Sequence, residues 1–369
     1  MNGNSRKVLV LTQGIDGGIA RMSSFLSSAL QEDGFEVMNF YIGRPGNEEY
    51  HLIDLSNGIQ SLVYTTGKTR SLAELIGLLK SIYIVYRLIA RFNPHIIVFN
   101  GQMPLLNYFF LGGASKKVFY DHGPQFSFSF IKNLINKIAL RFVDKIISVA
   151  NFSVERIVDM TGYKGEVDVV ANCVVNQSEI TTRRGFSLPT SLKVLMAARI
   201  DFVQKDPLTL IKAAKVAFDR GVNIEVQFAG SGPGEQHLID YISSYGCSEY
   251  VSYLGHVSSL NKILCRYNIS CLSSHYESFG LSLVEGMAAG HLAIGSKVCG
   301  INEVIIDGEN GLLFEEGSYE ELAEIFINVY TKPEDYNYCV DAGINDVEKL
   351  YTFEIYKRKI SQAFKNISR

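Results

Sequence analysis

The stretch 268-NISCLSSHYESFGLSLVEGMAAGHLAIGS-296 decides the fold class of this chain. Its two ends, 268–274 and 291–296, are short apolar runs typical of buried strands, and 281–290 has the apolar spacing of a helix. Two neighbouring strands that are joined by a helix usually run parallel, because the helix provides the long crossover that a parallel connection needs. The stretch therefore predicts an α/β protein with a parallel sheet.

The same alternation recurs on both sides of this stretch. Strands are expected at 7–13, 35–42, 95–101, 117–123 and 145–151, and again at 192–199, 223–230, 250–255 and 311–316. Helices are expected at 20–34, 71–92, 131–143, 207–220, 234–246, 258–266, 281–290, near 300–306, 318–330 and 352–368. Continuous apolar strands alternating with helices predict two doubly wound, Rossmann-like halves.

A polar segment at 172–191, which contains Pro189, separates the two series. We therefore expect an N-terminal domain at 1–175 and a C-terminal domain at 190–350, with the helix 352–369 packing back on the first. Doubly wound sheets bind ligands outside the carboxyl ends of their strands. Two such domains would face a central cleft, which is the natural place for a site.

Composition excludes several classes of protein. The chain has 369 residues with 47% hydrophobic content, which suits two ordinary cores, and its net charge of −3 does not indicate a nucleic-acid binder. The six cysteines are scattered without C-x-x-C spacing, so buried free thiols in a reducing compartment are expected. We find no signal peptide and no uncharged apolar run long enough to span a membrane, so a cytoplasmic protein is expected.

Charge is distributed unevenly along the chain. Residues 57–160 contain 12 Lys and Arg against 5 Asp and Glu, although the whole chain has a net charge of −3. The basic residues that we assign to one surface are Lys80, Arg87, Arg91, Lys132, Lys137, Arg141 and Lys145. Attachment to an anionic membrane at the inner face of the cell membrane is one interpretation, and solvated helix faces are an equally good one.

Several polar and glycine-rich positions directly follow expected strands. Gly17 and Gly18 precede a helix whose N–H groups could face an anion, although the spacing is not that of a dinucleotide fingerprint. Arg199 and Lys205 follow the first strand of the second half, where they could grip a diphosphate. Taken alone, these two cations would more often be solvated loop residues.

His122 ends a strand in 119-FYDHGPQ-125, where a functional and a structural role are equally plausible. No His, Cys or Asp spacing is typical of a metal site, so neither a metal nor a cofactor is expected. Glu277 lies in the loop before the helix that begins near Gly280, and Glu285 lies about one turn into it. The two carboxylates would therefore contact different parts of one long ligand, with a phosphate at the helix N-terminus between them.

These motifs together resemble glycosyltransferase family 4, whose members have the GT-B fold. Glu277 and Glu285, with seven residues between them, match its signature. The other matching segments, in order, are 17-GG-18, 171-ANCV-174, 199-RIDFVQK-205, 229-AGSGP-233, 254-LGHVS-258, 299-CGINEVI-305 and 307-DGENGLLF-314. Ala171 and Cys299 stand where most relatives have Pro and Gly.

The resemblance implies that the second half binds a nucleotide sugar. Glu285 would contact the ribose, and Glu277 the transferred sugar. The residues implied to hold the diphosphate are Arg199, Lys205, Phe279, Gly280 and Leu281. His256 and Val257 would meet the base, and Gly230 is a further implied donor-binding residue. Gly17 and Gly18 would close over the phosphates, and His122 would lie near the sugar, so Glu277, His122, Arg199 and Lys205 are the implied catalytic residues.

The resemblance further implies a retaining, metal-independent hexosyltransferase. Its donor would be a UDP-, GDP- or similar nucleoside-diphosphate sugar, and its acceptor a glycan or polyprenyl-linked molecule. By analogy, the product would be a bacterial surface polysaccharide such as lipopolysaccharide O-antigen, capsule or exopolysaccharide. A nucleotide-sugar epimerase of GT-B fold and a non-catalytic nucleotide-sugar-binding partner are the alternatives.

Overall fold

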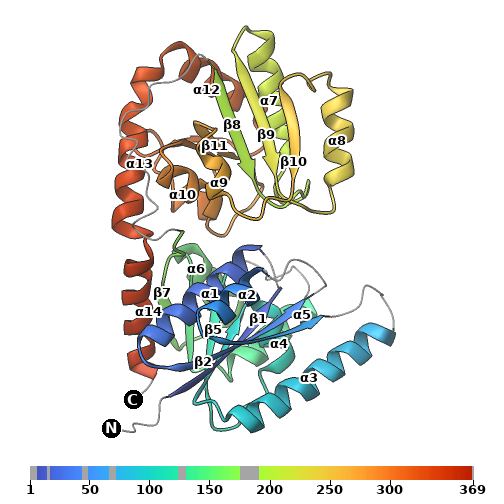
Figure 1. Cartoon of the computed structure of the whole chain (residues 1–369), viewed down its shortest axis with the longest axis vertical. Helices are drawn as coiled ribbons and strands as arrows, with labels where there is room; N and C mark the ends of the chain where they lie inside the picture. Colours follow the sequence, from blue (N-terminus) through green and yellow to red (C-terminus); the bar gives the residue numbers. More distant parts are fainter. Residues whose placement is uncertain are drawn as a thin grey trace. The chain divides into compact units, whose positions relative to one another are not determined.

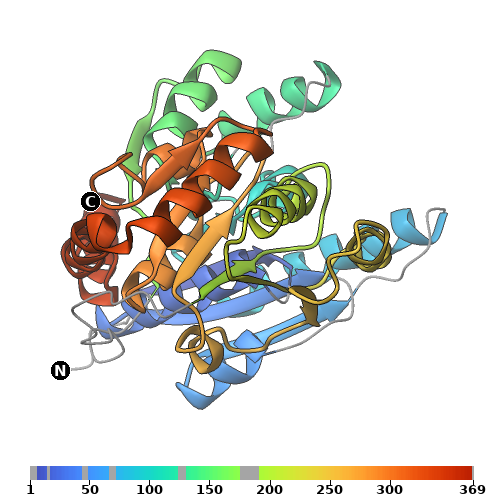
Figure 2. The ribbon, with the colours of Figure 1, turned by 90° about the horizontal axis from the view of Figure 1, so that it is seen from above.

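The computed structural model describes residues 6–14, 17–43, 49–65, 72–123, 130–174 and 191–367. The chain divides into two compact units: unit 1 comprises Met1–Asn172 and Glu354–Arg369, and unit 2 comprises Cys173–Phe353. In two perpendicular views, helices flank the strands of each unit (Figures 1 and 2). Most of the linker expected at 172–191 lies outside the described residues.

Unit 1 contains a seven-stranded parallel sheet in the order β3-β2-β1-β4-β5-β6-β7. Its strands are β1 (Lys7–Gln13), β2 (Glu36–Gly43), β3 (Gln60–Thr65), β4 (Ile96–Asn100), β5 (Lys116–Asp121), β6 (Lys145–Ser148) and β7 (Glu166–Val169). All five residues of β4 are buried, as expected for a central strand covered on both faces.

Unit 2 contains a six-stranded parallel sheet in the order β10-β9-β8-β11-β12-β13. Its strands are β8 (Leu192–Ala197), β9 (Ile224–Ala229), β10 (Val251–Gly255), β11 (Ile269–Leu272), β12 (Leu292–Ser296) and β13 (Leu312–Phe314). This is the 3-2-1-4-5-6 order of a Rossmann sheet. The expected fold class, two Rossmann-like α/β domains, is confirmed.

The helices of unit 1 are α1 (Gly17–Glu32), α2 (Glu49–Ser56), α3 (Leu72–Phe92), α4 (Gln102–Tyr108), α5 (Phe130–Leu140), α6 (Asn151–Thr161) and α14 (Phe353–Ile367). α14 contributes to the core of unit 1, since Phe364 and Tyr356 are buried there. The ring of Phe364 lies 6.2 Å from that of Phe35, edge to face.

The helices of unit 2 are α7 (Pro207–Asp219), α8 (Glu235–Ser244), α9 (Asn261–Leu264), α10 (Leu281–Ala288), α11 (Cys299–Asn302), α12 (Tyr319–Thr331), the 3-10 helix η2 (Pro333–Tyr336) and α13 (Asn337–Leu350). Several starts have a local cause: Ser318, for example, accepts a hydrogen bond from the N–H of Glu321, as an N-cap should. α2, β3, α4, α6, β7, η2 and α13 were not predicted from the sequence.

Lys145 does not belong to the basic surface to which the sequence analysis assigned it. Its side chain is 3% exposed and its Nζ lies 2.7 Å from Asp168 and 3.4 Å from Glu166. It also donates to the carbonyl of Ala363 in α14, at 3.3 Å. The prediction was wrong because Lys145 begins a fully buried strand, and the register with β7 sets Glu166 directly opposite it. The side chain of Lys132 lies outside the described residues.

The expectation of buried cysteines is confirmed for four of the six. Cys265 and Cys299 are exposed instead, whereas Cys173, Cys247, Cys271 and Cys339 are buried. Cys265 directly follows α9, which is shorter than the helix expected at 258–266.

Candidate functional site

The strand order of unit 2 places two predicted loops side by side. Its sheet runs outward in opposite directions from β8 and β11, which are neighbours, and such a switch point leaves a crevice at the strands' carboxyl ends. The loop after β8 carries Arg199 and Lys205, and the loop after β11 carries Glu277. The structure thus brings together residues that are far apart in the sequence.

Lys205 and Glu277 form an ion pair between these two loops. The side chains are 13% and 12% exposed, so water screens the pair less than it would on an open surface. Glu277 also accepts a hydrogen bond from the N–H of Ser278, at 3.1 Å. The sequence analysis assigned the two residues to different parts of a ligand, and their direct contact was not foreseen.

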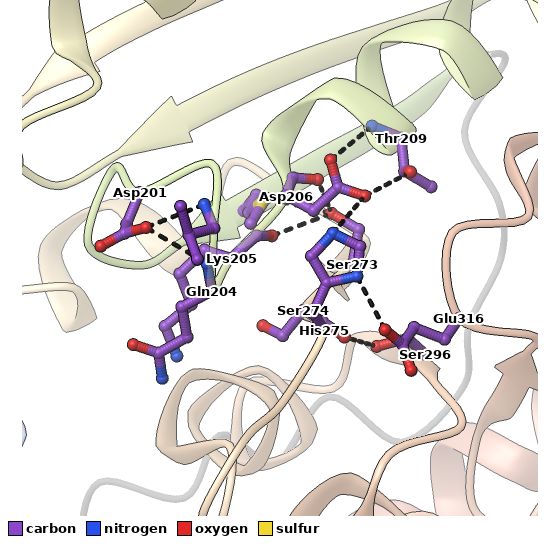
Figure 3. A network of polar contacts seen from close by, with 12 residues as sticks. Asp201, Gln204, Lys205, Asp206, Thr209, Ser273, Ser274, His275, Ser296 and Glu316 are labelled. Atoms are coloured by element: carbon purple, nitrogen blue, oxygen red, sulfur yellow. Dashed lines mark hydrogen bonds and ion pairs between the residues drawn. The ribbon is translucent and has the colours of Figure 1, made fainter. Parts of the chain in front are cut away.

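The loop that carries Lys205 is folded around Asp201 (Figure 3). The carboxylate of Asp201 accepts from the N–H groups of Val203 and Gln204, at 2.9 and 3.2 Å. Its carbonyl accepts from the N–H groups of Lys205 and Asp206, at 2.8 and 3.2 Å. These four bonds fix the backbone at Lys205, so little conformational entropy remains to be lost when a ligand binds there.

Asp206 ends this loop and starts helix α7. It has a left-handed conformation (φ 42°), and its carboxylate accepts from the N–H and the hydroxyl of Thr209, at 3.3 and 2.5 Å. Pro207 follows at the first helical position, where its missing N–H costs nothing. The helix start therefore anchors one side of the Lys205 loop.

Ser273 and His275 hold the other side, from the loop after β11 (Figure 3). The hydroxyl of Ser273 donates to the carbonyl of Asp206 at 2.7 Å, and the N–H of His275 donates to the carbonyl of Gln204 at 2.8 Å. The His275 ring contacts Glu316 at 2.8 Å and Asp206 at 3.6 Å. The two loops of the switch point are therefore tied together by one backbone–backbone bond and one hydroxyl–carbonyl bond as well as by the ion pair.

Glycines allow neighbouring loops to approach these two. A Cβ on Gly230, which has φ +137°, would lie 2.0 Å from the carbonyl oxygen of Ala198. A Cβ on Gly300 would lie 2.4 Å from the carbonyl carbon of Ser278, and the N–H of Gly300 donates to the carbonyl of Glu277 at 3.1 Å. Side chains at these two positions would displace the loops that carry Arg199 and Glu277.

Helix α10 begins beside Glu277. Gly280 is its N-cap and has φ 85°, a conformation that L side chains rarely adopt. Phe279 is buried with its ring edge-on to Tyr351, at 5.4 Å, which fixes the approach to the helix. The positive end of the α10 dipole is therefore at the predicted phosphate position, next to Leu281.

Glu285 lies in the second turn of α10 and is 4% exposed. Arg199 is exposed, His256 is exposed and Val257 is half-buried after β10. Arg199, Lys205, Glu277 and Gly280 therefore lie on the two central loops or at the start of α10. His256 and Val257 belong to a separate loop beyond the outer strand of the same sheet.

Unit 1 has its own switch point, between β1 and β4. Gly17 and Gly18 are exposed at the start of α1, after β1, and Gly17 has φ 75°. His122 follows β5, and its Nε2 lies 2.5 Å from Asn100 Oδ1 at the end of β4. The sequence analysis did not foresee this contact between Asn100 and His122.

The hydrogen bonds of Asn100 determine the tautomer of His122. The amide nitrogen of Asn100 donates to the carbonyl of Ile19, a pure acceptor, at 3.4 Å, so its oxygen faces the imidazole. His122 therefore donates from Nε2, which leaves Nδ1 as an acceptor. Burial lowers the pKa of His122 to about 3, so the ring is neutral at pH 7. It can accept a hydrogen bond from a hydroxyl but cannot supply positive charge.

Sequence reasoning also missed the residues that position Lys205: Asp201, Asp206, Ser273 and His275. One signal was available, since Asp206-Pro207 followed by Thr209 is a typical helix start. The contacts from Ser273 and His275 had no local signal, because they depend on which strands are neighbours. In the described parts of the chain, no group of three or more His, Cys, Asp or Glu side chains could hold a metal ion.

Models of glycosyltransferase domains match both halves of the chain. Residues 16–177 match the model described as Glycosyltransferase Family 4, and residues 179–346 match the one described as Glycosyl transferases group 1. The expected resemblance to glycosyltransferases is therefore confirmed at the level of domain families.

Two curated relatives illustrate the similarity. EpsD of Bacillus subtilis (strain 168), itself named only provisionally as a glycosyltransferase, is 32% identical over 132 residues, which is 36% of this chain and 35% of that protein. This chain thus spans about a third of the length of that relative. An uncharacterized glycosyltransferase of Haemophilus influenzae is 22% identical over 374 residues, covering 97% of this chain and 98% of that protein.

Solved structures share the fold. The crystal structure of Anabaena Alr3699/HepE in complex with UDP and glucose matches with a TM-score of 0.79 and 18% identity, covering 98% of this chain and all of that one. Such structural neighbours are GT-B glycosyltransferases, and the present chain has the GT-B fold.

Proposed function

We propose that this chain, a GT-B protein whose halves match two glycosyltransferase domain models, transfers a hexose-type unit from a nucleoside-diphosphate sugar to a glycan or polyprenyl-linked acceptor. The observation that carries the proposal is the Lys205–Glu277 ion pair at the switch point of unit 2, beside the N-terminus of α10. A cation, a carboxylate and a helix dipole together suit a ligand with both phosphate and hydroxyl groups.

We assign the diphosphate to Arg199, Lys205 and the N–H groups of Phe279, Gly280 and Leu281. Lys205 would exchange its carboxylate partner for a phosphate oxygen, which releases Glu277 to accept hydrogen bonds from sugar hydroxyls. Glu285 is assigned to the ribose. In the free protein the ion pair holds both side chains close to these positions, so the donor meets a prearranged site.

Also in unit 2, we assign His256 and Val257 to the base of the donor. Gly230 is assigned to a position where the backbone comes close to the donor, because it has no side chain. By the family resemblance, Gly17 and Gly18 of unit 1 are assigned to the phosphates, and His122 to the sugar. The neutral His122 ring, with Nδ1 as its acceptor, is suited to a sugar hydroxyl.

The proposed reaction keeps the anomeric configuration and uses no metal. The bond between the anomeric carbon and the diphosphate oxygen breaks, and the acceptor oxygen bonds to that carbon on the same face. The acceptor's proton passes to the departing diphosphate, so charge is balanced. Arg199 and Lys205 stabilise the negative charge that develops on the leaving group, a role that a divalent cation fills in other transferases.

For the acceptor we propose a glycan or polyprenyl-linked intermediate of bacterial surface polysaccharide synthesis, such as O-antigen, capsule or exopolysaccharide, at the inner face of the cell membrane. The support is the bound UDP and glucose in the Anabaena neighbour for the donor, and the basic region of unit 1 for the membrane-linked acceptor.

A thermal-shift screen with UDP, GDP and ADP, each alone and with a sugar attached, tests the donor site. One nucleoside diphosphate at 100 to 1,000 times its Kd should raise the free energy of unfolding by about 3–4 kcal/mol. Incubation of the matching sugar donor with a glycan acceptor should then yield a new glycoside. No stabilisation by any nucleotide would refute the donor site, and an epimerised donor without transfer would refute the transferase.

A further inference from the structure

Helix α3 presents large apolar side chains to solvent. Leu79 and Tyr83 are 57% and 58% exposed, and Ile76 and Tyr86 are exposed at the same helical spacing. The same outer face carries the exposed cations Lys80, Arg87 and Arg91. A surface helix normally turns its polar side outward, so this mixture of apolar and basic groups is unusual.

Helix α5 and the two residues after it repeat this composition. Leu134, Ile138 and Phe142 are exposed, as are the cations Lys137 and Arg141. We call the exposed side chains of these two helices the α3–α5 surface.

Helix α4 joins α3 and α5 into one layer on unit 1. The hydroxyl of Tyr108 in α4 donates to Ser81 of α3 at 2.9 Å. Phe109, which directly follows α4, has its ring 5.2 Å from that of Phe142. The three helices bury their inner sides in a single hydrophobic core, so their outer faces point away from the same side of the sheet.

The α3–α5 surface lies in a segment almost free of acidic residues. Between Glu74 and Asp144 the sequence contains eight Lys and Arg but a single acid, Asp121, which is buried. Of these cations, Lys117 is buried and Lys116 pairs with Asp144 at 3.0 Å. The surface itself carries five exposed cations, so it combines exposed apolar side chains with an excess of positive charge: Lys80, Arg87, Arg91, Lys137 and Arg141. A second copy of the same chain would oppose cations to cations across a two-fold axis, which is unfavourable.

A hollow of about 390 Å³ lies within this surface. Its walls are Tyr64 of β3 together with Ile76, Leu79, Lys80, Tyr83 and Ile84 of α3. The wall is apolar except for the Lys80 ammonium and the tyrosine hydroxyls. An acyl chain beside a phosphate headgroup has the matching chemistry.

We infer that the α3–α5 surface docks the protein on an anionic lipid bilayer, with the apolar side chains among the upper acyl chains and the cations at the headgroups. This is the arrangement by which amphipathic helices lie in a membrane interface, and each Lys or Arg near an anionic surface strengthens binding about fivefold. No helix among the described residues is long and apolar enough to cross the bilayer.

The first test uses a tryptophan as a reporter, because the chain contains none. Tyr83→Trp introduces one on the α3–α5 surface, and Ile239→Trp introduces a matched control at an exposed apolar position of α8 in unit 2. With vesicles of phosphatidylglycerol and phosphatidylcholine, the emission of Tyr83→Trp should shift to shorter wavelength and be quenched by brominated acyl chains. Ile239→Trp should show neither effect.

The second test is vesicle co-sedimentation. The triple variant Leu79→Ser, Lys80→Gln, Arg91→Gln should lower the partition coefficient at least about 25-fold, since it removes two cations and an apolar contact. The matched control, Ile239→Ser, Lys332→Gln, Lys349→Gln, removes the same kinds of exposed groups from unit 2 and should bind as the unaltered protein does. Binding should weaken as salt is raised and be lost on pure phosphatidylcholine.

Three outcomes would overturn the inference: no sedimentation with anionic vesicles, equal binding by the triple variant, or binding that salt does not weaken. Loss of self-association in the triple variant without loss of vesicle binding would assign the surface to a second copy instead. Neither test contains a nucleotide sugar. Failure here would remove the support for a membrane-linked acceptor but leave the proposed donor site untouched, and failure of the donor screen leaves this inference untouched.

Discussion

At the scale of single residues, Lys205 is assigned to the diphosphate and Glu277 to the sugar, and single variants of the two residues can separate these roles. Lys205→Ala should weaken nucleoside-diphosphate binding about 10–100-fold, because a charge-assisted hydrogen bond contributes about 1.5–3 kcal/mol. It should lower the transfer rate by about 100-fold or more. Glu277→Ala should abolish transfer but leave nucleoside-diphosphate binding intact, since the freed Lys205 still faces the phosphates. Thermal shift and product formation measure the two effects.

Lys215→Ala is the matched control for this prediction. Lys215 pairs with Asp219 on the outside of α7, at 2.9 Å, in the same unit as Lys205. Its removal should change neither binding nor transfer, because a surface ion pair contributes about 0–1 kcal/mol to stability. Full activity in Lys205→Ala would exclude the assigned diphosphate contact.

Asp121 makes the stability of unit 1 depend on pH. Burial raises its pKa from 3.8 to about 7, so between these values the folded state keeps a proton that the unfolded state has lost. Its contribution to the free energy of unfolding is therefore present below pH 3.8 and is lost as pH rises to 7. Asp121→Asn should gain stability over the unaltered protein between pH 4 and pH 8, by at most about 4 kcal/mol.

Urea unfolding of Asp121→Asn and of the unaltered protein, at pH 4.5 and at pH 8, measures this gain. The difference between their free energies of unfolding should be larger at pH 8. Comparing the proteins at each pH cancels His122, whose lowered pKa acts in the opposite direction: its contribution is lost as pH falls below 6.5. A difference that stays constant across the range would contradict a buried, protonated Asp121.

At the scale of elements, close packing of α10 on β11 explains the Gly-Met-Ala-Ala-Gly segment. A Cβ on Gly286 would lie 2.0 Å from Ser270 Oγ in β11. Gly286→Ala should therefore destabilise unit 2 by about 1–3 kcal/mol, although alanine favours a helix. Gly77→Ala in α3 is the control: a Cβ there meets nothing within 4 Å, so it should be neutral or stabilising by up to about 1 kcal/mol.

Unfolding of the two single variants in urea tests this pair. If Gly286→Ala proved as stable as Gly77→Ala, α10 would have room beside β11, and its start at Gly280 would not be fixed by packing. The contact between Gly286 and Ser270 lies in the middle of α10, six residues from Gly280. It nevertheless positions the N-terminal end of the helix, because the helix moves as one element.

The sequence predicted long elements well and short ones poorly. α3 and α7 have enough turns to show an apolar period, whereas α4 has seven residues and contains Pro104. β3 was missed because its exposed and buried positions do not read as one apolar run.

At the scale of the whole molecule, the two units should respond to mutation separately. Phe364 of α14 is fully buried in unit 1, and Phe326 of α12 is fully buried in unit 2. Phe364→Ala and Phe326→Ala should each cost about 3–5 kcal/mol, because both leave a cavity. The first should lower the urea midpoint of unit 1, and the second that of unit 2.

A nucleoside diphosphate distinguishes the two transitions, because most of its assigned contacts lie in unit 2, which it should stabilise more than unit 1. In Phe364→Ala the nucleotide-stabilised transition should keep its midpoint while the other one falls. A single shared transition that both variants shift equally would show that the units unfold together, contrary to this expectation.

The sequence by itself determined the class of this protein: two parallel α/β units, a loop with Arg199 and Lys205 after one strand, and a loop with Glu277 after another. These are local properties, since apolar periodicity and the residues after each strand depend on near neighbours in the chain. The tertiary structure alone decided which loops meet. Because strand order sets β8 beside β11, Glu277 pairs with Lys205 and Ser273 holds the Asp206 carbonyl. Because β6 lies beside β7, Lys145 is buried between carboxylates instead of facing a membrane.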